Sequence, residues 1–157
     1  YEGVALVKIK GKGWNFINTK GEFLWNGDKW FDRVETFSNG FARVKVEGKG
    51  FNFINTNGEL LWKGDKWFDW VSDFSNGFAV VKLESKYNYI NPQGELLWKE
   101  DKWFNEVYHF YKGFAEVYID NIPKRATNTK AVVFSAAFFV VWNNQEDETV
   151  MVGISVE

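Results

Sequence analysis

Hydrophobic and polar residues alternate along this chain in short runs that are separated by turn residues. From Phe41 to Glu47, Ala and Val alternate with Arg, Lys and Glu, the pattern of a strand with one buried and one exposed face. A second strand is predicted at 51–55 and a third at 59–62, joined by Asn57-Gly58, a pair that favours the two positive-φ positions of a type I′ turn. A fourth, aromatic-rich strand is predicted at 66–74.

This pattern of four strands recurs along the chain. Residues 3–39 and 40–76 are identical at 26 of 37 aligned positions. A third copy, 77–112, is one residue shorter in the turn after its first strand, and a partial fourth copy covers 113–119. Four strands in about 37 residues is the size of a β-propeller blade. The sequence therefore predicts an all-β fold of tandem four-stranded antiparallel units, in a propeller-like or open array.

Residues 120–157 depart from the repeat. A polar connection leads to two apolar runs, 131–142 and 149–157, which are predicted to pair as a β-hairpin. We expect a repeat array over 1–119 and a cap or docking element over 120–157, because terminal repeats need cover for their open edges. Three units and a fragment are too few to close as a ring. The array is expected to stay open, to be part of a longer propeller, or to complete itself by association.

The composition favours sheets and argues against two classes of partner. Aromatic residues make up 20% of the chain, and they prefer pleated surfaces. Lys and Arg number 19 against 21 Asp and Glu, so the chain lacks the basic excess that nucleic-acid binding requires. The longest apolar run, 131–142, is shorter than the roughly 20 residues of a membrane helix. Neither nucleic-acid binding nor membrane insertion is expected.

Catalysis and metal binding find few of their usual residues here. The chain has no Cys and one His, His109. A ring of carboxylates from Asp32 and Asp69 is interrupted by Asn105 in the third copy. The recurring glutamates each follow a turn glycine, where a solvated charge is ordinary: Glu22, Glu59 and Glu95. We therefore expect no enzymatic activity, no cofactor and no metal.

An asparagine follows an aromatic residue in the second strand of every copy, at Asn15, Asn52 and Asn88. Asparagine tolerates the left-handed backbone better than other residues with a Cβ. The column therefore predicts a β-bulge or a positive φ, a structural rather than a functional use.

The recurring sequence resembles the WG repeat of bacterial proteins over about 1–119. The resemblance rests on three segments that return in phase, seen for example at Gly40–Val44, Gly11–Thr19 and Trp30–Gly40. The glycine that follows the aromatic residue in the family is asparagine in this chain. The resemblance implies a β-rich repeat array, mostly found as a binding or accessory module of bacteria and their mobile elements. It transfers no catalytic residues.

Each copy carries an Asp-Lys-Trp triplet before its fourth strand. A carboxylate beside an indole can hold a sugar by hydrogen bonds and stacking, which makes a lectin-like site one hypothesis. The other is that every copy needs the same turn and the same packed indole. The residues concerned are Asp28, Trp30, Asp65, Trp67, Asp101 and Trp103. A further column is interpreted as core between repeats: Trp25, Trp62 and Trp98.

Columns that change between copies are the other candidates for function. One position of the fourth strand holds Arg33, Trp70 and Glu106, and the position two residues later holds Glu35, Ser72 and Tyr108, with the unrepeated His109 beside it. Same-face residues that vary on a fixed scaffold suit recognition of an irregular protein surface, whereas neutral variation is the alternative. We predict a non-catalytic binding module for another protein or for its own copy, with a carbohydrate as the alternative ligand.

Overall fold

The fold is all-β, as the sequence predicts. The computed structural model describes residues 3–25, 29–97, 103–110, 114–119, 129–134, 138–141 and 151–154. Thirteen strands lie in this part of the chain, without a helix that could span a membrane. The chain divides into two compact units, one of residues 1–74 with 92–95 and one of residues 75–91 with 96–157. We describe each unit by itself.

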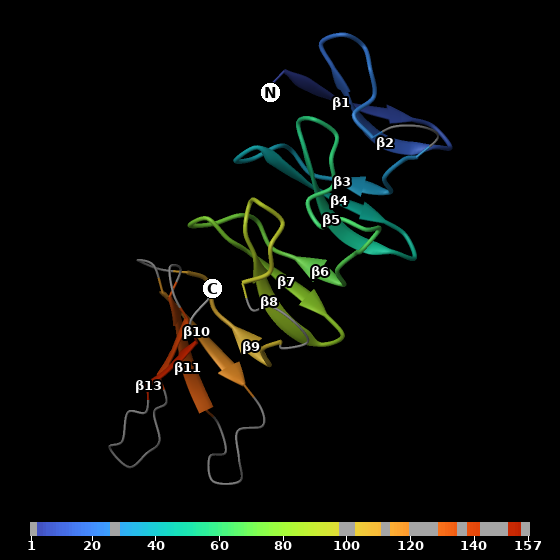
Figure 1. Ribbon diagram of the computed structural model, residues 1–157. Helices are drawn as coiled ribbons and strands as arrows, with labels where there is room; N and C mark the ends of the chain where they lie inside the picture. Colours follow the sequence, from blue (N-terminus) through green and yellow to red (C-terminus); the bar gives the residue numbers. More distant parts are fainter. Residues whose placement is uncertain are drawn as a thin grey trace. The chain divides into compact units, whose positions relative to one another are not determined.

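The first unit contains small antiparallel sheets that follow one another along the sequence (Figure 1). A hairpin is followed by a three-stranded sheet of order β3-β4-β5 and by the short β6. The bounds are β1 (Val4–Ile9), β2 (Gly13–Asn18), β3 (Arg33–Val34), β4 (Phe41–Val46), β5 (Gly50–Asn55) and β6 (Trp70–Val71). The alternation in the sequence is realised in β4 and β5, where Ala42, Val44 and Ile54 are buried on one face.

The second unit contains two hairpins and one three-stranded sheet. Antiparallel pairs are β7 with β8 and β12 with β13, and the sheet has the order β11-β10-β9. The bounds are β7 (Ala79–Leu83), β8 (Lys86–Ile90), β9 (Glu106–Val107), β10 (Phe114–Ile119), β11 (Thr129–Phe134), β12 (Phe138–Val141) and β13 (Met151–Ile154). The run 131–142, predicted as one strand, contains the last four residues of β11 and all of β12. The segment 120–128 of the predicted connection lies outside the described residues.

One segment links consecutive copies by pairing with two sheets. Phe31 exchanges two backbone hydrogen bonds with Trp14 of its own copy, at 2.8 and 2.9 Å. The next residues, in β3, pair with Lys45 and Val44 of the following copy. The amides of Asp32 and Glu35 donate to the carbonyls of Lys45 and Arg43, each at 2.9 Å. The predicted fourth strand is therefore divided between its own sheet and the next one.

The type I′ turns lie at a different place from the predicted one. Gly58 has a φ of 83°, but Asn57 is not among the residues with positive φ. The side chain of Asn55 accepts hydrogen bonds from the amides of Asn57 and Glu59, which closes this turn without a second left-handed residue. The I′ geometry occurs instead at Asn39-Gly40, with φ of 53° and 82°, between β3 and β4. The prediction for Asn57 was wrong.

The predicted third strand is present only as isolated bridges. Leu60 forms a single bridge with Ile54, and the amide of Leu61 donates to the carbonyl of Phe53 at 2.9 Å. Gly58, in the turn before it, lies so close to the preceding copy that a Cβ there would overlap the carbonyl oxygen of Leu24. A glycine is required at this position by the packing of one copy on the next.

The shortened turn of the third copy places two residues with a Cβ in the left-handed region. Glu84 and Ser85 have φ of 47° and 67° between β7 and β8. The corresponding turn of the second copy uses Gly48 and Gly50 at its positive-φ positions. Left-handed backbone is unfavourable for residues with a Cβ, so this two-residue turn is strained.

Replacing Glu84-Ser85 by Asn-Gly is expected to raise the free energy of unfolding by about 1 kcal/mol, because Asn-Gly suits both positions of a type I′ turn. Urea unfolding followed by circular dichroism measures the change. Asn57→Gly is the control, since Asn57 is exposed and has no positive φ. An unfolding free energy equal to or below the parent value would contradict the strain.

Candidate functional site

The asparagine column is a buried part of the scaffold. Asn52 on β5 is fully buried, and its Oδ1 accepts hydrogen bonds from the amides of Phe53 and Trp62 at 2.8 and 3.1 Å. Its Nδ2 donates to the carbonyls of Trp62 and Lys66, both at 3.0 Å. Asn15 makes the same four bonds in the first copy, and Asn88 is also buried.

The predicted positive φ at this column was wrong. Asn15, Asn52 and Asn88 lie in extended strands, and none of them has a positive φ. The side-chain amide acts instead as an extra peptide group, which satisfies backbone donors and acceptors 10 and 14 residues away. This column holds the segment between β5 and β6 in place and is unavailable to a ligand.

The Asp-Lys-Trp triplet of the second copy is engaged within the protein. Trp67 is 7% exposed and belongs to the core of the first unit, with its Nε1 donating to Asp65 Oδ1 at 3.1 Å. Lys49 Nζ donates to both carboxylate oxygens of Asp65, at 2.9 and 2.8 Å. These bonds, first that of Lys49 and then that of the indole, hold the pKa of Asp65 below its usual value.

The other members of the triplet column are less buried. Trp30 is half-buried and meets the ring of Phe23 edge-on at 5.1 Å, with Lys12 Nζ 5.8 Å from its centroid. Trp103 is half-buried as well. Asp28 and Asp101 lie outside the described residues.

The tryptophans of the column interpreted as core pack against phenylalanines of the predicted fourth strands. Trp25 stacks flat on Phe31, with ring centroids 4.0 Å apart, and Trp62 stacks on Phe68 at 3.8 Å. Trp98 lies outside the described residues. Both described stacks join rings of the same copy, and the described contact of this column with another copy is that of Trp25 with Trp67, whose ring centroids lie 6.1 Å apart.

The changing column lies on the outside of three equivalent strands. Arg33, Trp70 and Glu106 are the first residues of β3, β6 and β9, and all three are exposed. The second residue of each strand is valine, half-buried or buried. A constant inner residue therefore alternates with an outer residue that is basic, aromatic or acidic.

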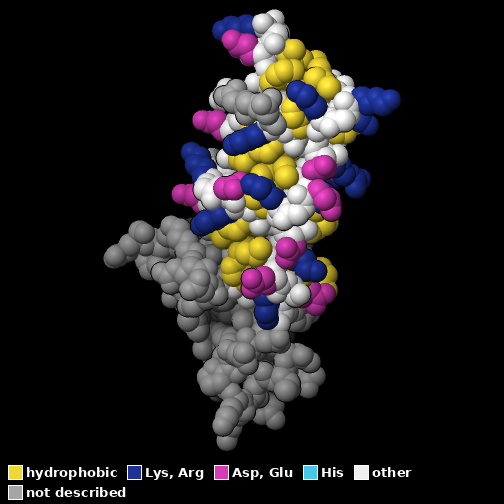
Figure 2. All heavy atoms as spheres, turned by 90° about the vertical axis from the view of Figure 1, so that its right-hand side faces the viewer, with side chains coloured by type: hydrophobic (Ala, Val, Ile, Leu, Met, Phe, Trp, Pro, Cys, Tyr) yellow, Lys and Arg dark blue, Asp and Glu magenta, His cyan; other side chains and the backbone are white. Residues whose placement is uncertain are grey.

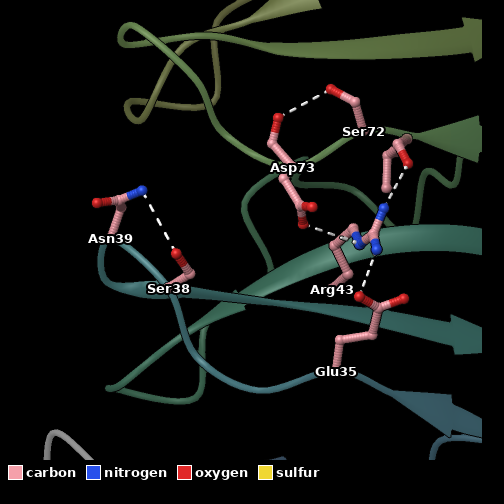
Figure 3. Close-up of polar contacts among 7 residues, drawn as sticks. Glu35, Ser38, Asn39, Arg43, Ser72 and Asp73 are labelled. Atoms are coloured by element: carbon pink, nitrogen blue, oxygen red, sulfur yellow. Dashed lines mark hydrogen bonds and ion pairs between the residues drawn. The ribbon is translucent and has the colours of Figure 1, made fainter.

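The neighbouring column is not uniformly exposed. Glu35 is held by Arg43 of β4, whose guanidinium also donates to the carbonyl of Val71 at 3.2 Å and pairs with Asp73 at 3.3 Å (Figure 3). Ser72 is only 6% exposed, and its hydroxyl donates to the carbonyl of Asp73 at 2.9 Å. The structure therefore separates Ser72 from the exposed candidates.

Sequence reasoning missed Arg43. The equivalent residues in the first and third copies are Leu6 and Val80, so the arginine at the centre of this ionic network is particular to the second of the three complete copies. The signal was present in the sequence, because Glu35 and Arg43 are charged at positions where the other complete copies hold uncharged residues. Glu35 is 8 residues away, but the other two partners, Val71 and Asp73, lie 28 and 30 residues away, beyond the reach of a local pattern.

Three candidates of the second unit are exposed close together in the sequence. Tyr108 is 50% exposed, and its hydroxyl donates to Glu106 Oε1 at 3.3 Å. His109, the next residue, is exposed. The carbonyl of Tyr108 accepts a hydrogen bond from the buried hydroxyl of Tyr89, and burial raises the pKa of Tyr89 above its usual range.

A lysine lies over an aromatic ring in each copy, a feature that sequence reasoning also missed. The distances from Nζ to the ring centroid are 4.7 Å for Lys8–Trp14, 5.7 Å for Lys45–Phe51 and 5.4 Å for Lys82–Tyr87. The partners are directly opposite each other across each hairpin. The sequence contained a signal for this feature, because a lysine and an aromatic residue recur at equivalent positions of the three hairpins. Figure 2 shows hydrophobic and charged side chains intermixed on one face.

The candidate metal ligand Asp32 has a structural role in the backbone pairing. Asp32 Oδ2 accepts a hydrogen bond from the amide of Glu47 at 2.7 Å, across the β3–β4 pairing. Among the residues that the structure describes, no three acidic or histidine side chains gather as metal ligands.

Comparisons with known proteins point to the repeat. The family model described as "WG containing repeat" matches residues 31–49 and 68–87. No curated protein matches the chain. A solved structure, that of the computationally designed Ika4 protein, shares 12% identity and a TM-score of 0.40 over 85% of this chain and 86% of that one. Each family match begins in a predicted fourth strand and extends past the first strand of the next copy, which supports the resemblance to the WG-repeat family.

Proposed function

We propose that the chain is a non-catalytic binding module that presents a protein-recognition surface on a β-repeat scaffold. One observation carries this proposal. The first residues of β3, β6 and β9 are exposed and differ in chemistry, whereas the second residues are the same. Repetition fixes the position of these side chains and leaves their chemistry free to match an irregular partner.

The surroundings of Arg33 and Trp70 suit a protein interface. Arg33 is opposite Lys45, which lies over Phe51, so the three form a row across β3, β4 and β5. Trp70 exposes 44% of its surface on β6, which lies beside β5 in the same unit. Trp and Arg are frequent among the residues that dominate binding energy at protein interfaces. We propose a partner with acidic and apolar groups for this surface.

The carbohydrate alternative has less support. An indole that holds a sugar needs an open face, and Trp67 is 7% exposed with its N–H and the carboxylate of Asp65 already paired. The ring of Trp30 also packs against that of Phe23. Two of the exposed rings, those of Trp70 and Tyr108, lie in the two columns that differ between copies, which favours a protein over a repeated small ligand.

Affinity capture with the whole chain tests the proposal. The wild type is compared, in extracts of its source, with a variant changed at Arg33→Ser, Trp70→Ser and Glu106→Ser. We expect a protein that is retained by the wild type and about tenfold less by the variant, at an unchanged melting temperature. The matched control is changed at exposed lysines elsewhere, Lys10→Ser, Lys20→Ser and Lys63→Ser.

Three results would contradict this proposal. Equal capture by wild type and variant would remove the changing column from recognition. Capture lost in both variants would indicate nonspecific charge attraction. Binding of the wild type on a glycan array, abolished by Trp30→Ala, would favour the carbohydrate alternative instead.

A further inference from the structure

Two turns of this chain have the same local sequence around an Asn-Gly pair. Residues 37–42 and 74–79 both read Phe-Ser-Asn-Gly-Phe-Ala. Both turns have the I′ conformation, with φ of 53° at Asn39 and 50° at Asn76, and of 82° and 83° at the glycines that follow. In each turn the serine and the second phenylalanine exchange two backbone hydrogen bonds, of 2.8 and 3.1 Å. The two asparagines therefore have the same neighbours in sequence and the same backbone.

The two asparagine side chains differ in how they are held. Each Nδ2 lies 3.4 Å from the hydroxyl oxygen of the preceding serine, a long contact that Figure 3 shows for Asn39. Asn76 Nδ2 also donates to the carbonyl of Phe110 at 2.7 Å. Phe74 is the counterpart of Phe110 in the repeat, and among the described residues Asn39 makes no hydrogen bond to it. Asn76 therefore has a strong hydrogen bond that Asn39 lacks.

The glycine amides of these two turns are available for reaction. Among the residues that the structure describes, the amides of Gly40 and Gly77 have no hydrogen-bond partner. A Cβ on either glycine would meet nothing within 4 Å, so the space beside each amide is open. In the other described Asn-Gly pair, that of Asn57, the amide of Gly58 donates to the carbonyl of Asn55 at 3.0 Å. That amide is engaged in its own turn.

We propose that Asn39 is a site of spontaneous deamidation in the folded protein, and that the carbonyl of Phe110 protects Asn76 from the same reaction. The amide nitrogen of Gly40 loses its proton and bonds to Cγ of Asn39, the bond from Cγ to Nδ2 breaks, and ammonia leaves. Water then opens the cyclic imide at one of its two carbonyls, which gives aspartate or isoaspartate. Asparagine is among the chemically labile residues, and water is the only co-reactant here.

The reaction changes the turn that joins β3 to β4. Either product adds one negative charge to an exposed position. Isoaspartate also lengthens the backbone by one carbon, and a two-residue I′ turn has no room for an extra backbone atom. The isoaspartate form is therefore expected to lose the paired hydrogen bonds between Ser38 and Phe41. This site lies apart from the changing column and does not depend on the recognition proposed above.

Incubation of the whole chain at neutral pH, with tryptic peptide mapping by mass spectrometry at intervals, tests the proposal. Trypsin separates Asn39 and Asn76, because Arg43 and four lysines lie between them. We expect Asn39 to be converted about fivefold faster than Asn76, because the side chain of Asn76 must first break a hydrogen bond to reach the reactive geometry. Asn57 is also expected to react more slowly than Asn39.

The unfolded chain is the matched control. In urea, the identical flanking residues are expected to give Asn39 and Asn76 the same rate, since the carbonyl of Phe110 no longer holds Asn76. Equal rates in the folded protein, faster conversion of Asn76, or no conversion of Asn39 while the unfolded chain reacts would each overturn the proposal. A rate difference that persisted in urea would overturn it as well, because the fold would not be its cause.

Discussion

Asn52→Ala is expected to lower the free energy of unfolding by about 4 kcal/mol or more, the largest effect that we expect from a single substitution. The change removes all four hydrogen bonds of a fully buried side chain. The buried amide of Phe53 loses this partner, and so do the partly buried amide and carbonyl of Trp62 and the carbonyl of Lys66. Burial of a backbone group without a hydrogen bond costs about 1–3 kcal/mol for each group, before any rearrangement.

Guanidinium unfolding followed by circular dichroism measures this loss, with Asn57→Ala as the control. Asn57 is exposed at the end of the neighbouring turn, so its truncation is expected to change the unfolding free energy by no more than about 0.5 kcal/mol. If Asn52→Ala unfolded within about 1 kcal/mol of the parent, the side-chain amide would not be the support that we describe.

Trp67→Ala is expected to cost about 3–5 kcal/mol, because truncation of a large core aromatic leaves a cavity. Trp67 packs in the same core as Phe16, Leu24 and Phe31, and its ring lies 6.1 Å from that of Trp25 in the preceding copy. The loss therefore affects two copies at once. It also removes the indole N–H from Asp65.

Trp70→Ala is the matched control, three residues along the same segment and 44% exposed. It is expected to change the unfolding free energy by about 0.5 kcal/mol. Circular dichroism is the suitable signal, since both variants remove a fluorophore. A Trp67→Ala protein that melts like the parent would overturn its place in the core and would strengthen the carbohydrate alternative over protein recognition.

The hairpins were predictable because their information is local. The alternation in Phe41–Glu47 and the repeat offset of 37 residues are enough to place β1, β4 and β7 with their partner strands. The exposure of Arg33, Trp70 and Glu106 was predictable for the same reason, since alternation assigns them to the outer face.

Features that depend on distant partners were not predictable. The role of Asn52 depends on carbonyls 10 and 14 residues away, and preference for a left-handed backbone pointed to the wrong explanation. The division of the fourth segment depends on which of two sheets each residue reaches, as at Phe31 and β3. Ser72 faces inward although alternation from Trp70 places it outside, because the chain leaves the strand after Val71.

In the second and third copies, the turn packs directly on the backbone of the preceding copy. The most direct test is the difference in unfolding free energy between Gly58→Ala and Gly21→Ala. The two glycines occupy equivalent positions in the turns of the first and second copies, and both have a φ of 83°. Only at Gly58 would the new Cβ overlap the carbonyl of Leu24. We predict a loss of about 1 kcal/mol for Gly21→Ala and about 2 kcal/mol more for Gly58→Ala. Equal losses for the two variants would contradict the claim.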